Sequence, residues 1–584
     1  MAIGRKRTGI GVGLLAVVVL AAVAFSTAGG AGANSKSVFA LPRSQTLYTT
    51  GTMWSPYSDL NPNKTWDYVT GTIGLVYETP FRYDPLKDKF IPWLASKGTW
   101  TKKNVYVMTV RSGVKWSDGV ALTGKDFKYT YTTLKIKEHP QNTLWTTGLK
   151  KVTYKGNKVT FTFSGTPNYQ EWDFYLYNVA IVPEHVWHSY TSNQIVSSNM
   201  ADPKKLVGTG PYVYESGLNS TESFVWKKRS GWWATSVYKM DPKPAYIVDI
   251  FNGSNSATFA NLLQGNLDLS NNFAAGIAKT EKSNPKIGTY FKKSPYQLGA
   301  NAVWLFPNTT KKPLNDVAFR KALAESINLN KIVAAAEDGQ VTKANPTGLL
   351  PIWNKYVDKN VVKKYGFSYS VAKAKSDLAA AGYKDANGDG FVKNKDGSKI
   401  DLSIIVPNGW SDWMTAIQMI SADAKAIGVK ITPSYPDYNT LVDDRGHANY
   451  DLLLGNDRAV ANTPWTYYDY VYRLPILDNQ TTVNYERFTD STAWNLTKQL
   501  DQTPTNNVGQ MKSIMSKLQT RFLQTLPAIP LWYNGMWAQW NTTHWTNWPS
   551  STVSSRQTLP AFWRGYLQMT GIDTLANLKP GPAA

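Results

Sequence analysis

The chain has 584 residues, more than one ordinary domain holds, which predicts several modules or two large lobes. Hydrophobic residues make up 42% of the chain and charged residues 18%, a balance that excludes wholesale disorder. Cysteine is absent, which excludes disulfides, thiolate metal sites and a lipidated N-terminal cysteine. The net charge of +22 comes from basic residues spread along the chain, so we expect no nucleic-acid partner.

The first 33 residues have the three parts of an export signal. A basic start at residues 5–7 is followed by an apolar stretch over residues 8–25 and a small-residue tail ending in an A-x-A pattern. We therefore expect residues 1–33 to be a signal peptide, with an uncleaved membrane anchor as the alternative. The rest of the chain is then expected to work at the extracellular face of the membrane or in the cell envelope, without a lipid-bearing cysteine.

Strand-like and helix-like patterns alternate along the rest of the chain, which predicts an α/β fold. The predicted strands cover residues 104–110, 158–163, 400–406, 429–431 and 450–454. The predicted helices cover residues 126–137, 319–336, 371–381 and 413–427, with Thr123 or Asp126 as the first N-cap and Gly382 and Gly428 as C-caps.

A segment near residue 390 has the spacing of a calcium-binding loop. Its ligand positions would be Asp385, Asn387, Asp389, Phe391 through its carbonyl oxygen, and Asp396. The alternative is a turn between a helix and a strand, because Gly388 and Gly390 favour one. We expect no required cofactor, and calcium, if bound, to be structural.

Five segments, in this order, resemble one family. They are residues 111–127, 208–212, 262–269, 313–323 and 529–533. They look like family 5 of the extracellular solute-binding proteins of ABC importers, which bind oligopeptides, nickel or oligosaccharides.

The resemblance implies a two-lobed α/β fold of the periplasmic-binding-protein type, with the ligand in a cleft between the lobes. The first lobe would be discontinuous, over residues 40–298 and 528–584, and the second would cover 299–527. The crossings between them would lie near residues 297–300 and 526–529. The resemblance also implies a monomer that delivers its ligand to permease subunits.

The aromatic composition favours a sugar as ligand. The chain has 23 Trp and 33 Tyr against 20 Phe, and an indole face packs well on a pyranose ring. Residues 406–414, and residues 462–469 within the loop over residues 455–469, resemble the cello-oligosaccharide-binding members. In peptide-binding members an Asp of this loop meets the terminal amine of the peptide. Here Val460 stands at that position, with Asp457 three residues earlier, so we expect a cello- or β-gluco-oligosaccharide, with an oligopeptide as the alternative.

The candidate ligand residues are aromatic and amide side chains near the predicted crossings and loops, because amides offer both donors and an acceptor to hydroxyl groups. They are Trp54, Asn271, Asn272, Asn301, Trp304, Asn456, Asp457, Trp465, Trp532, Asn534 and Trp537. Strand alternation puts Trp532 and Asn534 on one face and Trp537 on the other, so they cannot all face one cleft.

A secreted glycoside hydrolase is the alternative of another class. It would need two carboxylates about 5–10 Å apart, for which Glu171 with Asp173, or Asp443 with Asp444, are candidates. The chain has no G-x-S-x-G, H-E-x-x-H or phosphate-loop motif. We therefore expect a binding protein and not an enzyme.

Overall fold

The computed structural model describes residues 41–50, 59–64, 69–198, 205–216, 222–251, 253–480 and 482–583. The predicted signal peptide and the candidate ligand residue Trp54 lie outside these ranges. Within them, no helix has the length and apolar character needed to cross a membrane.

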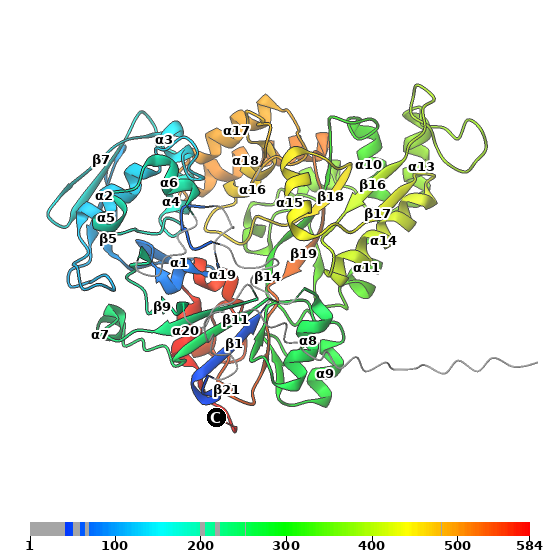
Figure 1. The fold of residues 1–584 in the computed structure, drawn as a ribbon. Coiled ribbons are helices and arrows are strands. Elements are labelled where there is room, and N and C mark those ends of the chain that lie inside the picture. Colours follow the sequence, from blue (N-terminus) through cyan, green and yellow to red (C-terminus); the bar gives the residue numbers. More distant parts are fainter. Residues whose placement is uncertain are drawn as a thin grey trace, which may run out of the picture.

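A seven-stranded mixed sheet combines segments from both ends of the chain (Figure 1). β1 at its centre runs parallel to β11 and β12, and the remaining pairs are antiparallel. In spatial order the strands are β13 (Ile287–Thr289), β20 (Gln539–Asn541), β12 (Leu269–Ser270), β1 (Thr46–Thr50), β11 (Tyr246–Ile250), β10 (Ser223–Lys228) and β9 (Tyr212–Tyr214).

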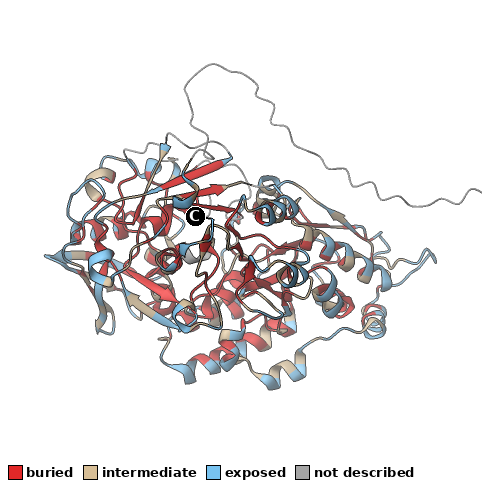
Figure 2. Cartoon of the chain, turned by 90° about the horizontal axis from the view of Figure 1, so that it is seen from below, coloured by how far each residue is buried: buried red, intermediate tan, exposed pale blue. Residues whose placement is uncertain are grey.

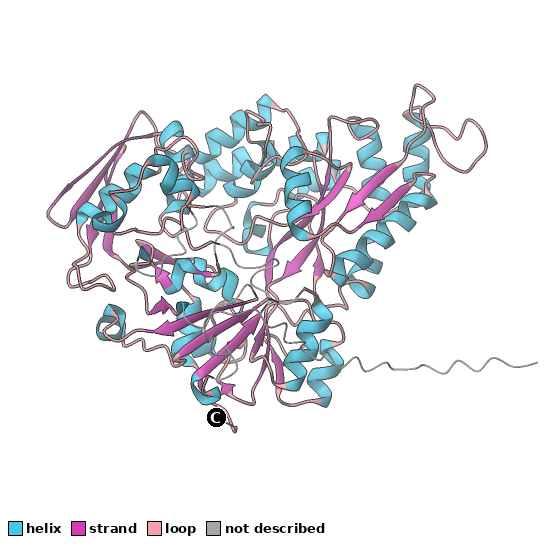
Figure 3. Ribbon diagram, viewed as in Figure 1, coloured by secondary structure: helices cyan, strands magenta, loops and turns pink. Residues whose placement is uncertain are grey.

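A six-stranded sheet is built mainly from the second half of the chain. In spatial order its strands are β15 (Thr342–Lys343), β19 (Ile529–Gly535), β14 (Gly299–Pro307), β18 (Leu452–Gly455), β16 (Leu402–Ile405) and β17 (Ile431–Ser434). β14, β18 and β19 are buried almost throughout, and helices pack along the sheet (Figure 3). Figure 2 shows the same division, with buried strands inside and helices that turn exposed faces outward.

A four-stranded antiparallel sheet forms a separate layer beside the other two. It comprises β5 (Ala95–Lys102), β6 (Val105–Val110), β8 (Lys158–Phe163) and β7 (Leu149–Lys155). The short strands are β2 (Val76–Tyr77), the pair β3 (Phe81–Asp84) and β4 (Lys89–Pro92), and the pair β21 (Trp545–Thr546) and β22 (Lys579–Pro580).

The helices surround these sheets (Figure 3). They are α1 (Thr72–Leu75), α2 (Gly124–Thr133), α3 (Thr143–Thr147), α4 (Tyr169–Tyr175), α5 (Glu184–Trp187), α6 (Ser192–Ser197), α7 (Trp233–Tyr238), α8 (Asn255–Gln264), α9 (Ile277–Ser283), α10 (Val317–Ser326), α11 (Leu329–Ala335), α12 (Lys359–Tyr365), α13 (Val371–Ala380), α14 (Ser411–Ala426), α15 (Tyr438–His447), α16 (Trp465–Tyr472), α17 (Ser491–Asp501), α18 (Val508–Thr525), α19 (Phe562–Leu567) and α20 (Gly571–Asn577). Three 3-10 turns are η2 (Arg43–Gln45), η5 (Pro351–Tyr356) and η6 (Ser554–Arg556).

The chain passes between the seven- and six-stranded sheets twice, before β14 and after β19. We call the elements before β14 and after β19 the first lobe, and those from β14 to β19 the second lobe. The predicted crossing near residues 526–529 is too early, because β19 pairs along its length with β14. The chain leaves the second lobe only at residues 536–538.

Local sequence signals located several elements correctly. α2 begins after Thr123 with a capping box to Asp126, and strands β6 and β8 lie where alternation placed them. The single helix predicted over residues 319–336 is wrong, because the chain forms α10 and α11 there. Asn328 breaks the run: its side chain caps Lys331 N–H and its own N–H donates to Asp423 Oδ2 at 2.8 Å.

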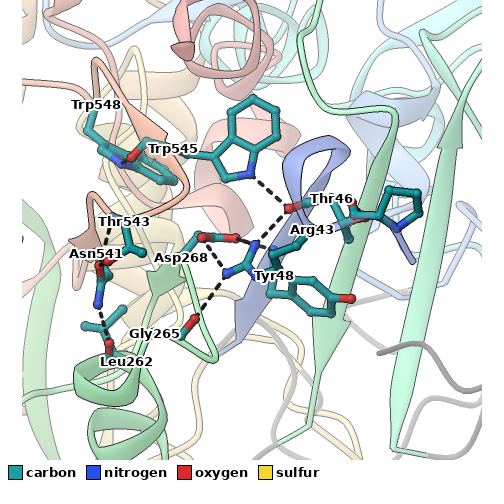
Figure 4. A network of polar contacts seen from close by, with 11 residues as sticks. Arg43, Thr46, Tyr48, Leu262, Gly265, Asp268, Asn541, Thr543, Trp545 and Trp548 are labelled. Carbon is teal, nitrogen blue, oxygen red and sulfur yellow. Dashed lines mark hydrogen bonds and ion pairs between the residues drawn. The ribbon is translucent and has the colours of Figure 1, made fainter. Parts of the chain in front are cut away.

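A polar network joins the two ends of the first lobe (Figure 4). Arg43 donates from both Nη atoms to the two oxygens of Asp268, at 2.8 and 2.7 Å. Tyr48 N–H donates to the same carboxylate at 2.8 Å, and Trp545 Nε1 donates to Thr46 O at 2.9 Å. The aspartate of the segment over residues 262–269 therefore fixes β12 against β1 and the N-terminal turn.

Asp268→Asn is expected to lower the free energy of unfolding by about 3 kcal/mol, because it removes a buried carboxylate that pairs with the half-buried Arg43 guanidinium and accepts from Tyr48 N–H. The urea midpoint of the purified protein checks this. Asp401→Asn is the control, because Asp401 pairs with Lys399 and Lys430 at the surface, and should cost under about 1 kcal/mol. Equal losses in both variants would contradict the prediction.

Candidate functional site

One edge of the six-stranded sheet collects several candidate residues. β16, β17 and β18 are parallel, so their carboxyl ends meet at this edge, where α/β folds place their sites. β14 is antiparallel to β18 and begins here, and β19 ends here. Asn301 and Asn534 stand directly opposite each other on β14 and β19.

The loop after β18 joins this edge to the first lobe. Asn301 Nδ2 donates to Asn456 O, and Val460 N–H donates to Ala300 O at 2.7 Å. Gln568, from the C-terminal part of the first lobe, donates through Nε2 to Val460 O at 3.0 Å. The loop is therefore held by one lobe and touched by the other.

The loop after β16 makes a second contact between the lobes. Asn255 N–H, at the start of α8, donates to Gly409 O at 3.3 Å, and Asn255 Nδ2 donates to Asp412 Oδ1 at 3.1 Å. Beside this contact the half-buried ring of Trp410 stacks on Tyr438, with centroids 6.1 Å apart. The edge of the second lobe thus carries an aromatic pair at the boundary with the first.

Five buried amide side chains lie around the two crossings, and we call them the amide floor. They are Asn272, Gln297, Asn301, Asn534 and Gln539, each at most 7% exposed. Hydrogen bonds and strand pairing link them: Ala538 N–H donates to Gln297 Oε1 at 3.2 Å, and Gln539 pairs with Ser270. None of the five is charged.

Each member of the amide floor has a polar atom with no hydrogen-bond partner in the described part of the chain. These atoms are Asn272 Oδ1, Gln297 Nε2, Asn301 Oδ1, Asn534 Oδ1 and both side-chain atoms of Gln539. An unpaired buried polar atom costs about 1–3 kcal/mol. These atoms are therefore available to a hydroxyl-rich molecule or to water.

Some predicted ligand residues lie elsewhere. The ring of Trp304 is enclosed by Phe306, Tyr467 and Phe522, so it packs in the core rather than facing a cleft. Both polar atoms of the Asn271 side chain are hydrogen-bonded to the backbone. Its Nδ2 donates to Trp537 O at 3.0 Å, and its Oδ1 accepts from Phe562 N–H at 3.2 Å. Both placements differ from the expectation that these side chains face a ligand.

The remaining predicted aromatic residues are buried near the same edge. Trp465 begins α16, Trp532 lies on β19 beside Asn534, and Trp537 packs edge-on against Phe273 of the first lobe at 5.3 Å. Sequence reasoning missed Gln297 and Gln539. The sequence marks Gln297 and Gln539 only weakly as site residues. Each is a single amide beside a crossing between the lobes, and the position of that crossing has to be known first.

Asp457 is already paired. Its Oδ2 accepts from Arg445 Nη1 at 2.8 Å, and the Arg445 guanidinium lies over the Tyr485 ring at 4.6 Å. The two residues are half-buried and come from α15 and the loop after β18. A ligand ammonium would have to displace Arg445 to use this carboxylate.

The calcium-like loop has the contacts of a turn. Asp385 accepts from Asp389 N–H at 3.1 Å and from Gly390 N–H at 2.9 Å, and Lys393 contacts Asp389 at 2.6 Å. The hydrogen bond and charge of Lys393 lower the pKa of Asp389 to about 2. No group of three or more His, Cys, Asp or Glu side chains able to hold a metal ion occurs among the described residues. Calcium binding stays a prediction, and it would require Lys393 to release Asp389.

Comparison with known proteins decides the family. The sequence profile of the bacterial extracellular solute-binding proteins, family 5, matches residues 89–475. The chain belongs to this family. The ordered motifs in the sequence pointed to the same family, and the mixed α/β sheets match its two-lobed fold.

The similar solved structures and curated relatives bind different ligands. A periplasmic oligopeptide-binding protein of Thermotoga maritima, solved with mannohexaose bound, has 38% identity and a TM-score of 0.87, covering 92% of this chain and 99% of that one. The oligopeptide-binding protein AppA of Bacillus subtilis is 26% identical over 59% of this chain and 61% of its own length. Its structure with a nonapeptide, at 18% identity and a TM-score of 0.73 over 92% of this chain and 99% of that one, shows the shared fold.

Proposed function

We propose that this protein captures a neutral oligosaccharide between its lobes and delivers it to the permease of an ABC importer. The amide floor carries the proposal, because it presents buried donors and acceptors without a charged side chain. Sugar hydroxyls both donate and accept, so they can satisfy both kinds of atom. Trp410, at the edge of the same region, offers an indole for a pyranose face.

The relative solved with mannohexaose supports a sugar of several hexose units. The sequence favours cello- or β-gluco-oligosaccharides, so both gluco- and manno-oligosaccharides are candidates. An oligopeptide is the second candidate, because the curated relatives include oligopeptide-binding proteins. The Arg445–Asp457 ion pair weighs against it, since it occupies the carboxylate three residues before Val460, the position that resembles the amine-binding Asp of peptide-binding members.

Capture would proceed by closure of the lobes. A ligand favours the closed form only if it binds that form better than the open one. The amide floor meets this condition, because Asn301 and Asn534 belong to the second lobe and Asn272 and Gln539 to the first. A sugar that contacts both sets ties the lobes together.

Calorimetric titration of the mature protein with cellobiose to cellopentaose and with mannohexaose tests the proposal, with tri- to pentapeptides as the comparison. We expect saturable sugar binding, no peptide binding and no sugar hydrolysis in the recovered ligand. Binding of peptides without any binding of sugars would overturn the proposal in favour of the second candidate. Released sugar fragments would instead establish a hydrolase.

Asp457→Asn separates the two candidates further. If the ligand is neutral, its affinity should change by less than about threefold, because the carboxylate serves Arg445 rather than the ligand. If Asp457 receives a peptide amine, peptide affinity should fall at least about 100-fold, since a charge-assisted pair is lost. Titrations of wild type and variant with mannohexaose and a tripeptide give the answer.

A further inference from the structure

Helix α4 of the first lobe is fastened to the second lobe, beside α16 and α17 (Figure 1). Gln170 Nε2 donates to Leu500 O at 2.9 Å and to Thr503 O at 3.0 Å, and its Oε1 accepts from the hydroxyl of Thr463. Gln170 and Thr463 are fully buried. We call this contact the α4 latch, and opening of the lobes must break it.

Two carboxyl groups meet inside the latch, one from each lobe. Glu171 N–H donates to Asp501 Oδ1 at 2.8 Å, and the two side chains are 0% and 7% exposed. Glu171 Oε2 accepts from Asn168 and from Thr147 Oγ1, the latter at 2.8 Å. Glu171 Oε1 is buried and has no hydrogen-bond partner. Glu171 therefore binds the second-lobe carboxyl through its N–H and keeps a buried, unpaired carboxyl oxygen of its own.

The basic groups around the pair are engaged by a third carboxylate, Asp469. Arg473 donates to Asp469 Oδ1 through Nε at 2.7 Å, and Arg458 Nη2 lies 3.6 Å from Asp469 Oδ2. A further acid on α4, Asp173, accepts from Thr505 at 3.1 Å, and burial raises its pKa to about 7. The ion pairs of Arg458 and Arg473 are thus made with Asp469, and Arg473 acts on Glu171 and Asp501 only at longer range.

We propose that closure of the lobes takes up one proton at the buried carboxyl pair that Asp501 and Glu171 form across the α4 latch. In the closed form burial, followed by the charge of Glu171, raises the pKa of Asp501 well above its ordinary value. In the open form the two carboxyls part, and the solvated Asp501 ionises with the ordinary aspartate pKa of about 4. The closed form therefore binds one more proton than the open form between these two pKa values.

The sign follows from linkage. The closed-to-open ratio is highest below the open-form pKa and falls about tenfold for each pH unit up to the closed-form pKa, above which it is level. The latch holds in acid and weakens as the pH rises.

The distance between the lobes measures this without any ligand, so the result does not depend on which solute the protein captures. The chain has no cysteine, so Lys150→Cys on β7 and Lys512→Cys on α18, both exposed, accept one nitroxide label each. Pulsed electron paramagnetic resonance then gives the distance distribution from pH 5 to pH 9. We expect the wild-type background to shift from a short to a longer distance as the pH rises.

Asp501→Asn should hold the short distance across the range, since the amide carries no charge at any pH. Glu171→Gln removes the neighbouring charge and should shift less than the wild type, which keeps the test valid if one variant fails to fold. Asp443→Asn, an exposed carboxyl on α15, is the matched control and should shift like the wild type. An unchanged wild-type distance, or a shift in both pair variants equal to the wild type, would overturn the proposal.

Discussion

Replacing Asn301 and Asn534 together by alanine is expected to weaken oligosaccharide binding about 100-fold. Each amide offers a donor and an acceptor to ligand hydroxyls, and losing such a partner costs about 1–1.5 kcal/mol, or roughly tenfold in affinity. The two residues face each other across β14 and β19, and each has a free buried oxygen. Titration with mannohexaose and cellopentaose gives the affinity ratio to wild type.

The matched control is Asn266→Ala, an exposed amide after α8 whose side chain contacts only its neighbours Asn261 and Gln264 in the hydrogen bonds described. Its affinity should stay within twofold of the wild type. A double variant that binds sugar as the wild type does would remove the amide floor from the binding site. An unchanged melting temperature in the double variant separates lost contacts from lost structure.

Glu78→Ala is expected to destabilise the first lobe by at least about 4 kcal/mol. The carboxylate is fully buried and accepts from three indoles: Trp93 Nε1 at 2.9 Å, Trp232 Nε1 at 3.3 Å and Trp233 Nε1 at 2.8 Å. Removing it leaves three buried donors unpaired and a cavity beside them, and both effects lower the free energy of unfolding. The midpoint of denaturant unfolding, followed by tryptophan fluorescence, measures the loss.

Glu138→Ala is the control for this experiment, because Glu138 is an exposed glutamate in the same lobe and should cost under about 0.5 kcal/mol. Glu78→Gln should fall between the two, since its carbonyl accepts from one indole while its NH₂ group opposes another. A loss in Glu78→Ala no larger than that of the control would show that the indoles find other acceptors.

Sequence patterns sufficed where the signal is local. The capping box at Thr123 and Asp126 set the start of α2, and alternation along residues 158–163 set β8. The order of five short motifs was enough for the family and its fold. Each of these rests on neighbouring residues or on chain order alone.

The parts that failed depend on contacts between distant segments. The helix predicted over residues 319–336 is broken at Ile327 and Asn328, where Asn328 N–H bonds Asp423, a residue far away in sequence. The ion pair that neutralises Asp457 involves Arg445 on the preceding helix. The amide floor draws its five residues from three stretches of the chain that are far apart in sequence, so no local pattern marks it. Tertiary packing determines these features, so the composition and the periodicity of the sequence could not predict them.

The two crossings between the lobes are bonded to each other. Met536 N–H donates to Leu298 O at 2.6 Å, and Ala538 N–H donates to Gln297 Oε1 at 3.2 Å. Twisting one strand past the other, or sliding them, would break these bonds, whereas bending both together keeps them. We therefore expect the two crossings to bend together as one hinge, so that the polar groups of the two lobes return to the same relative positions each time the lobes close.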